Sequence, residues 1–135
     1  MGERTLVVIK PDAVRRKLAG KIISRFEEKG FTIENLKSYS FSKEKAEEFY
    51  SAHNNKPFFN ELVSFIISGP SMALILHGNN AIDTVRIMIG STKSYEAVPG
   101  TIRGDLALNI TDNVVHASDS YESFIKEAAV IFDSI

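Results

Sequence analysis

The order of strand-like and helical segments constrains the fold of this chain more than any other feature. Four short runs favour strands because they are apolar and β-branched or alternate with polar residues: 4–10, 38–42, 72–78 and 113–116. Apolar residues at helical spacing fill most of the chain between these runs. Interleaved strands with helices covering one face of their sheet predict an α+β sandwich built on a split βαβ unit.

The first four helical regions are bounded by caps and breakers. The signals predict one helix from the Lys10-Pro11-Asp12 stretch to Gly30, and a short helix capped by Ser42. Pro57 suits the first turn of a further helix, and another helix is expected from about residue 80 to Gly90. The apolar faces of these helices are expected to pack against the sheet.

Residues 90–112 lack periodicity and are predicted to be a loop, which at this length is usually functional. A final helix begins near 118–120, where Asp119 and Glu122 are spaced like a capping box. The residues expected to be buried by that helix are Tyr121, Phe124, Ile125, Ala128 and Phe132.

The composition excludes several classes of protein. A chain of 135 residues that is 44% hydrophobic predicts a single domain over 1–135. Its net charge of −1 argues against a nucleic-acid binder that relies on bulk charge. The absence of cysteine excludes disulfides and cysteine-ligated metals. No apolar run has the length of a membrane span and no secretory signal is visible, so a cytoplasmic protein is expected.

His116 is the strongest candidate for chemistry, because it lies where the fourth strand passes to the final helix. An imidazole is partly unprotonated near neutral pH and can act as a nucleophile or a base. A packed or capping histidine is the alternative at this point. His53 in a polar loop and His77 beside a turn are predicted to have no chemical role.

Several polar residues are candidates for a polyphosphate clamp, since phosphoryl transfer needs mainly positioning and charge neutralisation. Lys10 ends the first strand, Arg86 lies off its helix's apolar stripe, and Arg103 lies in the long loop. Thr92 and Asn113 complete this set. Each basic residue taken alone is typical of a solvated surface charge.

Two further side chains, Phe58 and Glu127, each allow two interpretations. Phe58 lies off the stripe of its helix, so it either stacks on a nucleotide base or is a half-exposed aromatic. Glu127 lies off the stripe of the final helix, so it either orients His116 or is an ordinary surface glutamate.

Five segments in order, "RTLVVIKPDAV", "KPFF", "SGP", "PGTIRGD" and "NVVHASDSYES", resemble the nucleoside diphosphate kinases over essentially the whole chain. The resemblance implies a ferredoxin-like βαββαβ sandwich with an antiparallel four-stranded sheet covered by helices. It also implies a ping-pong reaction in which a nucleoside triphosphate phosphorylates His116 and a nucleoside diphosphate then takes the phosphoryl group. Broad base and sugar tolerance, and maintenance of NTP and dNTP pools, are expected.

The resemblance implies a role for each candidate. His116 matches the nucleophile, Glu127 the residue that positions it, and Ser118 a hydroxyl bound to that glutamate. The residues that match the phosphate and ribose site are Lys10, Tyr50, Arg86, Thr92, Arg103 and Asn113. The residues that match the base site are Phe58, Leu62 and Ile110. Mg²⁺ is expected on the nucleotide phosphates without protein ligands, and the protein is expected to be a homo-oligomer, with a hexamer favoured over a tetramer.

The chain departs from the family pattern at two places. Ala117 stands where the family usually has glycine, which would be strained if this position needed a positive φ. Lys93-Ser94 replaces the Asn-Pro that commonly follows the threonine, so a stiffening proline is lost. Two other classes of protein are alternatives: a nucleotide-sensing or nucleic-acid-binding relative, and a structural regulatory module. The near-zero charge counts against nucleic-acid binding, and the match at His116 counts against a structural module.

Overall fold

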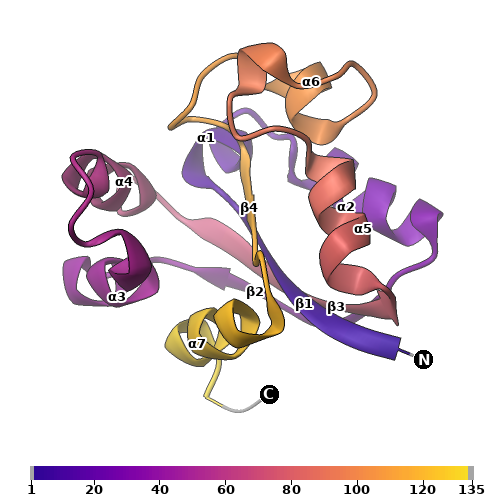
Figure 1. Cartoon of the computed structure of the whole chain (residues 1–135), viewed down its shortest axis with the longest axis horizontal. Helices are drawn as coiled ribbons and strands as arrows, with labels where there is room; N and C mark the ends of the chain where they lie inside the picture. Colours follow the sequence, from indigo (N-terminus) through magenta and orange to yellow (C-terminus); the bar gives the residue numbers. More distant parts are fainter. Residues whose placement is uncertain (1, 134–135) are drawn as a thin grey trace.

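The computed structural model describes residues 2–133, which form a four-stranded antiparallel sheet with the strand order β2-β3-β1-β4 (Figure 1). The strands are β1 (Gly2–Ile9), β2 (Thr32–Tyr39), β3 (Ser71–Asn79) and β4 (Val115–Ala117). The helices are α1 (Pro11–Arg15), α2 (Ala19–Lys29), α3 (Lys43–Phe49), α4 (Phe59–Ile66), α5 (Ala81–Ile89), α6 (Ile102–Leu106) and α7 (Tyr121–Ile131), with 3₁₀ turns η1 (Ser51–His53) and η2 (Ser94–Glu96). The predicted ferredoxin-like α+β sandwich is confirmed.

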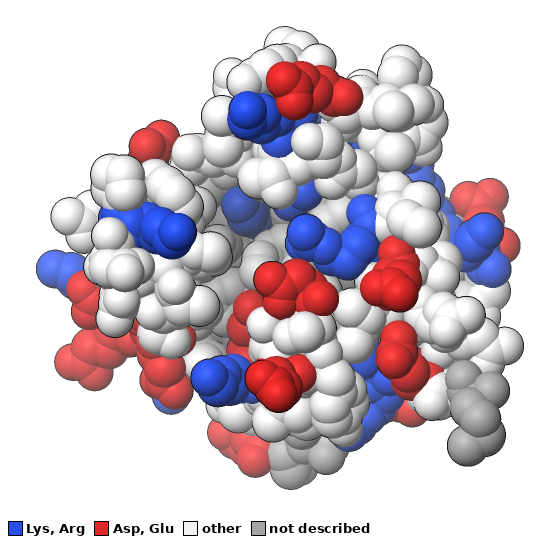
Figure 2. All heavy atoms as spheres, in the orientation of Figure 1, with Lys and Arg blue, Asp and Glu red and all other residues white. Residues whose placement is uncertain are grey.

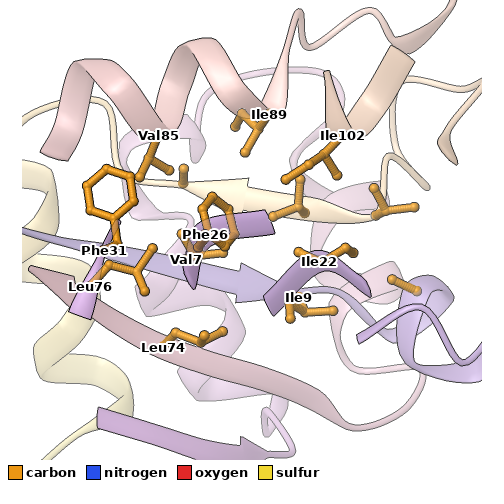
Figure 3. Packing of buried hydrophobic residues seen from close by; sticks show 14 of the residues in the cluster. Val7, Ile9, Ile22, Phe26, Phe31, Leu74, Leu76, Val85, Ile89 and Ile102 are labelled. Atoms are coloured by element: carbon orange, nitrogen blue, oxygen red, sulfur yellow. The ribbon is translucent and has the colours of Figure 1, made fainter. Parts of the chain in front are cut away.

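The central strand β1 is buried on both faces, which corrects the expectation of helices on one face only. Leu6 and Val8 pack into the core beneath α3, α4 and α7, while Val7 and Ile9 pack into the core beneath α2 and α5 (Figure 3). All four of these side chains are fully buried. The cause is visible in the sequence, because a strand covered on both faces reads as a continuous apolar run.

The register of the sheet places His116 next to that central strand. β4 runs antiparallel to β1, and His116 lies opposite Val8. Residues opposite each other in an antiparallel pair project to the same face. The side chain of His116 therefore lies on the face covered by α3, α4 and α7.

The single helix predicted from residue 11 to Gly30 is wrong, because the chain breaks between α1 and α2. Lys17 adopts a left-handed conformation with φ 61°. The backbone N–H of Lys17 donates to Val14 and that of Leu18 donates to Ala13, which is the Schellman pattern that ends helices. Glycine usually takes this position, so a lysine there gives no signal in the sequence. The predicted stop at Gly30 is confirmed.

The predicted structureless loop over 90–112 is also wrong, because it contains α6 and the turn η2. Thr101 caps α6 by accepting the backbone N–H of Gly104 at 3.0 Å. A helix of five residues spans little more than one turn, so it cannot show a repeating apolar pattern.

Smaller corrections concern helix and strand starts. α4 begins at Phe59, so Pro57 precedes the helix, and β4 covers 115–117 where 113–116 was predicted. The second strand was predicted at 38–42, but β2 spans Thr32–Tyr39 and ends where that prediction begins. Ser120, and not an Asp119–Glu122 box, caps α7 by accepting the N–H of Ser123.

The burial predicted along α7 is only partly correct. Phe124 and Ala128 are buried, and Phe132 is buried just beyond the helix. Tyr121 and Ile125 remain 53% and 39% exposed. Val130 and Ile131, which were not predicted to be buried, are buried as well, so the buried stripe is shifted toward the C-terminal end of the helix. Within residues 2–133, no helix is long and apolar enough to cross a membrane.

Candidate active site

His116 lies in a largely enclosed position with its ring packed against aromatic side chains. Its side chain is 21% exposed. The ring of Phe49, at the end of α3, contacts the imidazole at a centroid distance of 4.9 Å with the planes inclined by 62°. The ring of Tyr50 lies 6.3 Å away. Packing of this kind restricts the imidazole to one orientation.

Glu127 of α7 fixes which nitrogen of the imidazole carries the proton. Nε2 of His116 lies 2.8 Å from Oε1 of Glu127, and the Ser118 hydroxyl donates to that same oxygen at 2.7 Å. A carboxylate only accepts hydrogen bonds, so we assign the proton to Nε2. In the neutral imidazole, Nδ1 then carries the free lone pair.

Arg103 is buried, although its predicted place in a loop is by itself typical of a solvated charge. Its side chain comes from α6 and is only 4% exposed. Its Nε, Nη1 and Nη2 donate to the carbonyl oxygens of Asn113, Gly90 and Val115 at 3.3, 3.1 and 2.6 Å. Burial and the neighbouring charge of Arg86 lower the pKa of Arg103 to about 10. Arg103 therefore links α6 to the segment that leads into β4.

The position of α6 depends on close packing and on contacts with α2. A Cβ atom on Gly104 would overlap the carbonyl oxygen of Val98, so only glycine fits there. Arg25 of α2 forms an ion pair with Asp105 at 2.7 Å. These contacts explain why the "PGTIRGD" stretch forms a short helix against the body of the domain.

Lys10 is likewise buried, with 4% of its surface exposed. Its Nζ donates to Oδ1 of Asn113 at 2.9 Å and to the carbonyl of Thr111 at 3.3 Å. Burial, followed by the charge of Arg103, lowers the pKa of Lys10 to about 8, with the charge of Asp12 acting in the opposite direction. Lys10 and Arg103 thus meet at Asn113, one on its side chain and one on its backbone.

Arg86 and Tyr50 complete the group around His116. Arg86 is exposed on α5 and donates to the carbonyl of Ala117 at 3.2 Å, next to His116. Burial, followed by the nearby charge of Glu127, raises the pKa of the Tyr50 phenol, which therefore stays protonated. Figure 2 shows Lys and Arg atoms inside the hollow at the centre of this face, with Asp and Glu atoms along its lower border. The site therefore carries positive charge that can neutralise a bound polyphosphate.

The remaining predicted residues are not drawn into this network. Phe58 is 43% exposed, and its ring packs against the ring of His53 at a centroid distance of 5.7 Å. Leu62 packs at the edge of the core, and Thr92 is exposed. Ile110 is 48% exposed.

Ile110 lines a shallow hollow of about 350 Å³ between α4 and the segment that follows α6. The hydroxyl of Thr111 donates to Glu61 of α4 at 2.9 Å across this hollow. That bond joins the helix of Leu62 to the segment of Ile110, so the two apolar base-site candidates lie on connected walls.

The structure also shows two residues that the sequence did not single out. Phe49 contacts the imidazole directly, and Asp12 accepts a hydrogen bond from the backbone of Val114. Phe49 was visible only as part of a helical stripe. Asp12 gave a signal through its place in "IKPD", but it was interpreted only as a helix start.

Ala117 is not strained, which removes one doubt raised by the sequence. It lies in β4 and is not among the residues with positive φ within the described chain. The strained residue is instead Val114, with φ 63°, two positions before His116.

The other two histidines lie apart from this group. His53 is exposed, and His77 lies in β3 opposite Arg4. Among residues 2–133, no group of three or more His, Asp or Glu side chains is placed to hold a metal ion.

Comparisons with known proteins agree with this geometry. A family model described as "Nucleoside diphosphate kinase" matches residues 3–135. Over 130 residues the chain is 61% identical to a nucleoside diphosphate kinase of Staphylothermus marinus, covering 96% of this chain and 92% of the relative. Over 130 residues it is 55% identical to one of Hyperthermus butylicus, with the same coverage of 96% and 92%.

Solved structures give the same result. The nucleoside diphosphate kinase of Halobacterium salinarum in complex with CDP superposes with a TM-score of 0.95 at 42% identity, covering 99% of this chain and 90% of that one. The enzyme of Aquifex aeolicus also gives a TM-score of 0.95, at 44% identity, covering 99% of this chain and 97% of that one.

Proposed function

The chain belongs to the nucleoside diphosphate kinase family and moves the terminal phosphoryl group of a nucleoside triphosphate to a nucleoside diphosphate; we propose that His116 carries this group between the two substrates. One observation supports the proposal above the others. Glu127 binds Nε2 of His116 at 2.8 Å, which leaves the lone pair of Nδ1 available as a nucleophile. The motif resemblance and the geometry thus select the same histidine.

In the first half-reaction, the Nδ1 lone pair attacks the terminal phosphorus. The bond between that phosphorus and the bridging oxygen breaks, and the departing nucleoside diphosphate keeps the electron pair. The imidazole becomes positively charged, and the Glu127 carboxylate at Nε2 stabilises that charge. A second nucleoside diphosphate then attacks the same phosphorus, the P–N bond breaks, and its electron pair returns to Nδ1.

The clamp residues supply positive charge along the polyphosphate. Lys10, Arg86 and Arg103 surround the approach to His116, and phosphoryl transfer relies mainly on such neutralisation. A guanidinium has five N–H donors, and Arg103 uses three on backbone carbonyls. Two donors of Arg103 therefore remain for phosphate oxygens.

We propose that Mg²⁺ enters with the nucleotide. In the clamp, Lys10, Arg86 and Arg103 are cations and Asn113 is an amide, and these groups suit phosphate oxygens better than a divalent cation. Mg²⁺ would supply further charge neutralisation on the phosphates, which themselves hold it together with water.

Labelling without an acceptor tests the phosphohistidine. Incubation with ATP labelled in its terminal phosphate should leave about one phosphoryl group per chain, labile to acid and stable to base. Addition of GDP should then move the label to GTP. A label that is stable to acid or labile to base would place the phosphoryl group on a hydroxyl or a carboxylate and overturn the assignment.

Phe58→Ala should weaken nucleotide binding while sparing the chemical step. Phe58 offers a half-exposed aromatic face, and stacking of a base on such a face contributes about 1–3 kcal/mol. We expect the ATP concentration needed for half-saturation to rise about tenfold, with a small change in the saturated rate of His116 phosphorylation. Purine and pyrimidine substrates, both ribo and deoxy, should be affected alike. A saturated rate that falls as far as the half-saturation concentration rises would instead place Phe58 in the catalytic geometry.

The charge of Lys10 should make activity sensitive to alkaline pH. The pKa of Lys10 in the folded protein is about 8, so the ammonium dominates below that value and the neutral amine above it. Polyphosphate binding requires the ammonium, so kcat/KM should fall as pH rises through about 8. Phe58→Ala, which changes no titrating group, should show the same inflection. Lys10→Met should lower kcat/KM and remove the inflection, and an unchanged inflection in Lys10→Met would assign it to another group.

The wider biological setting is part of the same proposal. Replenishment of NTP and dNTP pools in the cytoplasm, and a homo-oligomer of six or four chains, follow from the family resemblance. Exposed apolar side chains such as Leu36, Val98 and Leu108 support self-association. A molar mass by light scattering equal to one chain would contradict the oligomer.

A further inference from the structure

The segment just before β4 contains a strained turn at Val114. This fully buried residue has φ 63°, a conformation that β-branched side chains rarely adopt. The N–H of Val115 donates to the carbonyl of Asn113 at 2.8 Å, two residues back, so the segment is a γ-turn centred on Val114. Strained backbone of this kind persists only where the surrounding structure holds it.

Two contacts from one neighbouring segment hold the turn. The N–H of Val114 donates to Oδ2 of Asp12 at 3.1 Å, and the carbonyl of Val114 accepts the backbone N–H of Lys10 at 2.9 Å. Asp12 lies in the first turn of α1 and is only 8% exposed. Its other oxygen, Oδ1, has no hydrogen-bond partner in the described part of the chain. The buried carboxylate of Asp12 is thus held by its hydrogen bond to the turn.

The turn sets the direction of groups on both of its sides. The carbonyls of Asn113 and Val115, which flank Val114, both accept hydrogen bonds from Arg103. The side chain of Asn113 accepts Nζ of Lys10, and His116 follows Val115 directly. An extended conformation at Val114 would turn these carbonyls apart and shift His116 relative to Arg103.

We propose that Asp12 is a positioning residue for phosphoryl transfer, because its carboxylate holds the turn at Val114 that aligns His116 with Arg103. Asp12 does not touch the phosphorus and acts through the backbone. The inference rests on the proposed phosphohistidine at His116.

The test is the single-turnover rate of His116 phosphorylation at saturating ATP, measured at a temperature where each variant is folded. Asp12→Ala should slow this rate on the order of tenfold to a hundredfold, because small misalignments of reacting groups have effects of that size. Asp12→Asn keeps a neutral acceptor at the same place and should retain more of the rate. Glu44→Ala, which removes an exposed acidic residue from the first turn of α3, should leave the rate unchanged.

A second substitution separates the effect of Asp12 on the backbone turn from the effect of its negative charge on Lys10. Val114→Gly relieves the strain, because glycine adopts positive φ freely. In the Asp12→Ala background, Val114→Gly should therefore restore a large part of the lost rate. If Asp12 acted only by keeping Lys10 charged, Val114→Gly would restore nothing. Should Asp12→Ala not fold, Asp12→Asn with and without Val114→Gly decides the same question.

The outcomes distinguish this inference from the proposed function. A wild-type protein that is not labelled, or whose label persists in His116→Ala, overturns the phosphohistidine itself. A wild-type protein labelled on His116, with Asp12→Ala equally fast or not rescued by Val114→Gly, overturns the role of Asp12 alone.

Discussion

His116→Ala should leave no phosphorylated protein after incubation with ATP and should reduce transfer from ATP to GDP on the order of 10⁴-fold or more, as loss of a nucleophile does in other enzymes. The physical reason is that the other groups of the site only orient the substrates and the imidazole and neutralise the charge of the phosphates. Glu127 binds the imidazole and Ser118 binds Glu127, and within residues 2–133 neither of the other two histidines joins these bonds. The measurement is label retained on the protein, followed by the rate of GTP formation.

Two other histidines serve as controls for this substitution. His53→Ala and His77→Ala remove an imidazole without touching the network around Glu127, so both variants should be labelled like the wild type. Label that survives His116→Ala, or that is lost in His77→Ala, would contradict the assignment.

Arg103→Ala should produce the second-largest loss, lowering the saturated rate of His116 phosphorylation by about 10²–10³-fold. The substitution removes a positive charge near the transferred group. It also frees the carbonyls of Gly90, Asn113 and Val115, which Arg103 binds together. Single-turnover kinetics at saturating ATP measure the effect.

Arg103→Lys separates the two contributions of this residue. A lysine keeps the charge, but its single nitrogen cannot reproduce the planar fork that reaches three carbonyls. We expect a rate between those of the wild type and Arg103→Ala. Wild-type kinetics in Arg103→Ala would show that this buried charge takes no part in the reaction.

Sequence patterns predicted the elements whose signals repeat or are local. Three of the strands, the Ser42 cap and the stop at Gly30 were predicted from apolar runs, hydroxyl caps and glycine, and the structure confirms them. The second strand was predicted at 38–42 but spans Thr32–Tyr39. The break at Lys17 and the turn at Val114 were missed for a common physical reason. At both positions, a residue that intrinsically disfavours positive φ is held there by tertiary or helix-end hydrogen bonds.

The candidate site divides in the same way. The family resemblance selected His116, Glu127 and Lys10, but no local pattern shows that the glutamate, eleven positions along the chain, reaches Nε2. That contact depends on how α7 packs against β1, the strand that pairs with β4. Burial of Arg103 also could not be predicted from composition, because it depends on the short helix α6 and its contacts with α2.

The position of the phosphoryl group on the imidazole tests the central claim most directly. Nuclear magnetic resonance of the ¹⁵N-histidine-labelled protein, phosphorylated by ATP and free of acceptor, correlates phosphorus with the nitrogen that carries it. We predict coupling to Nδ1 of His116, with Nε2 still protonated and bound to Glu127. Phosphorus coupled to Nε2, or to no histidine nitrogen at all, would contradict the account.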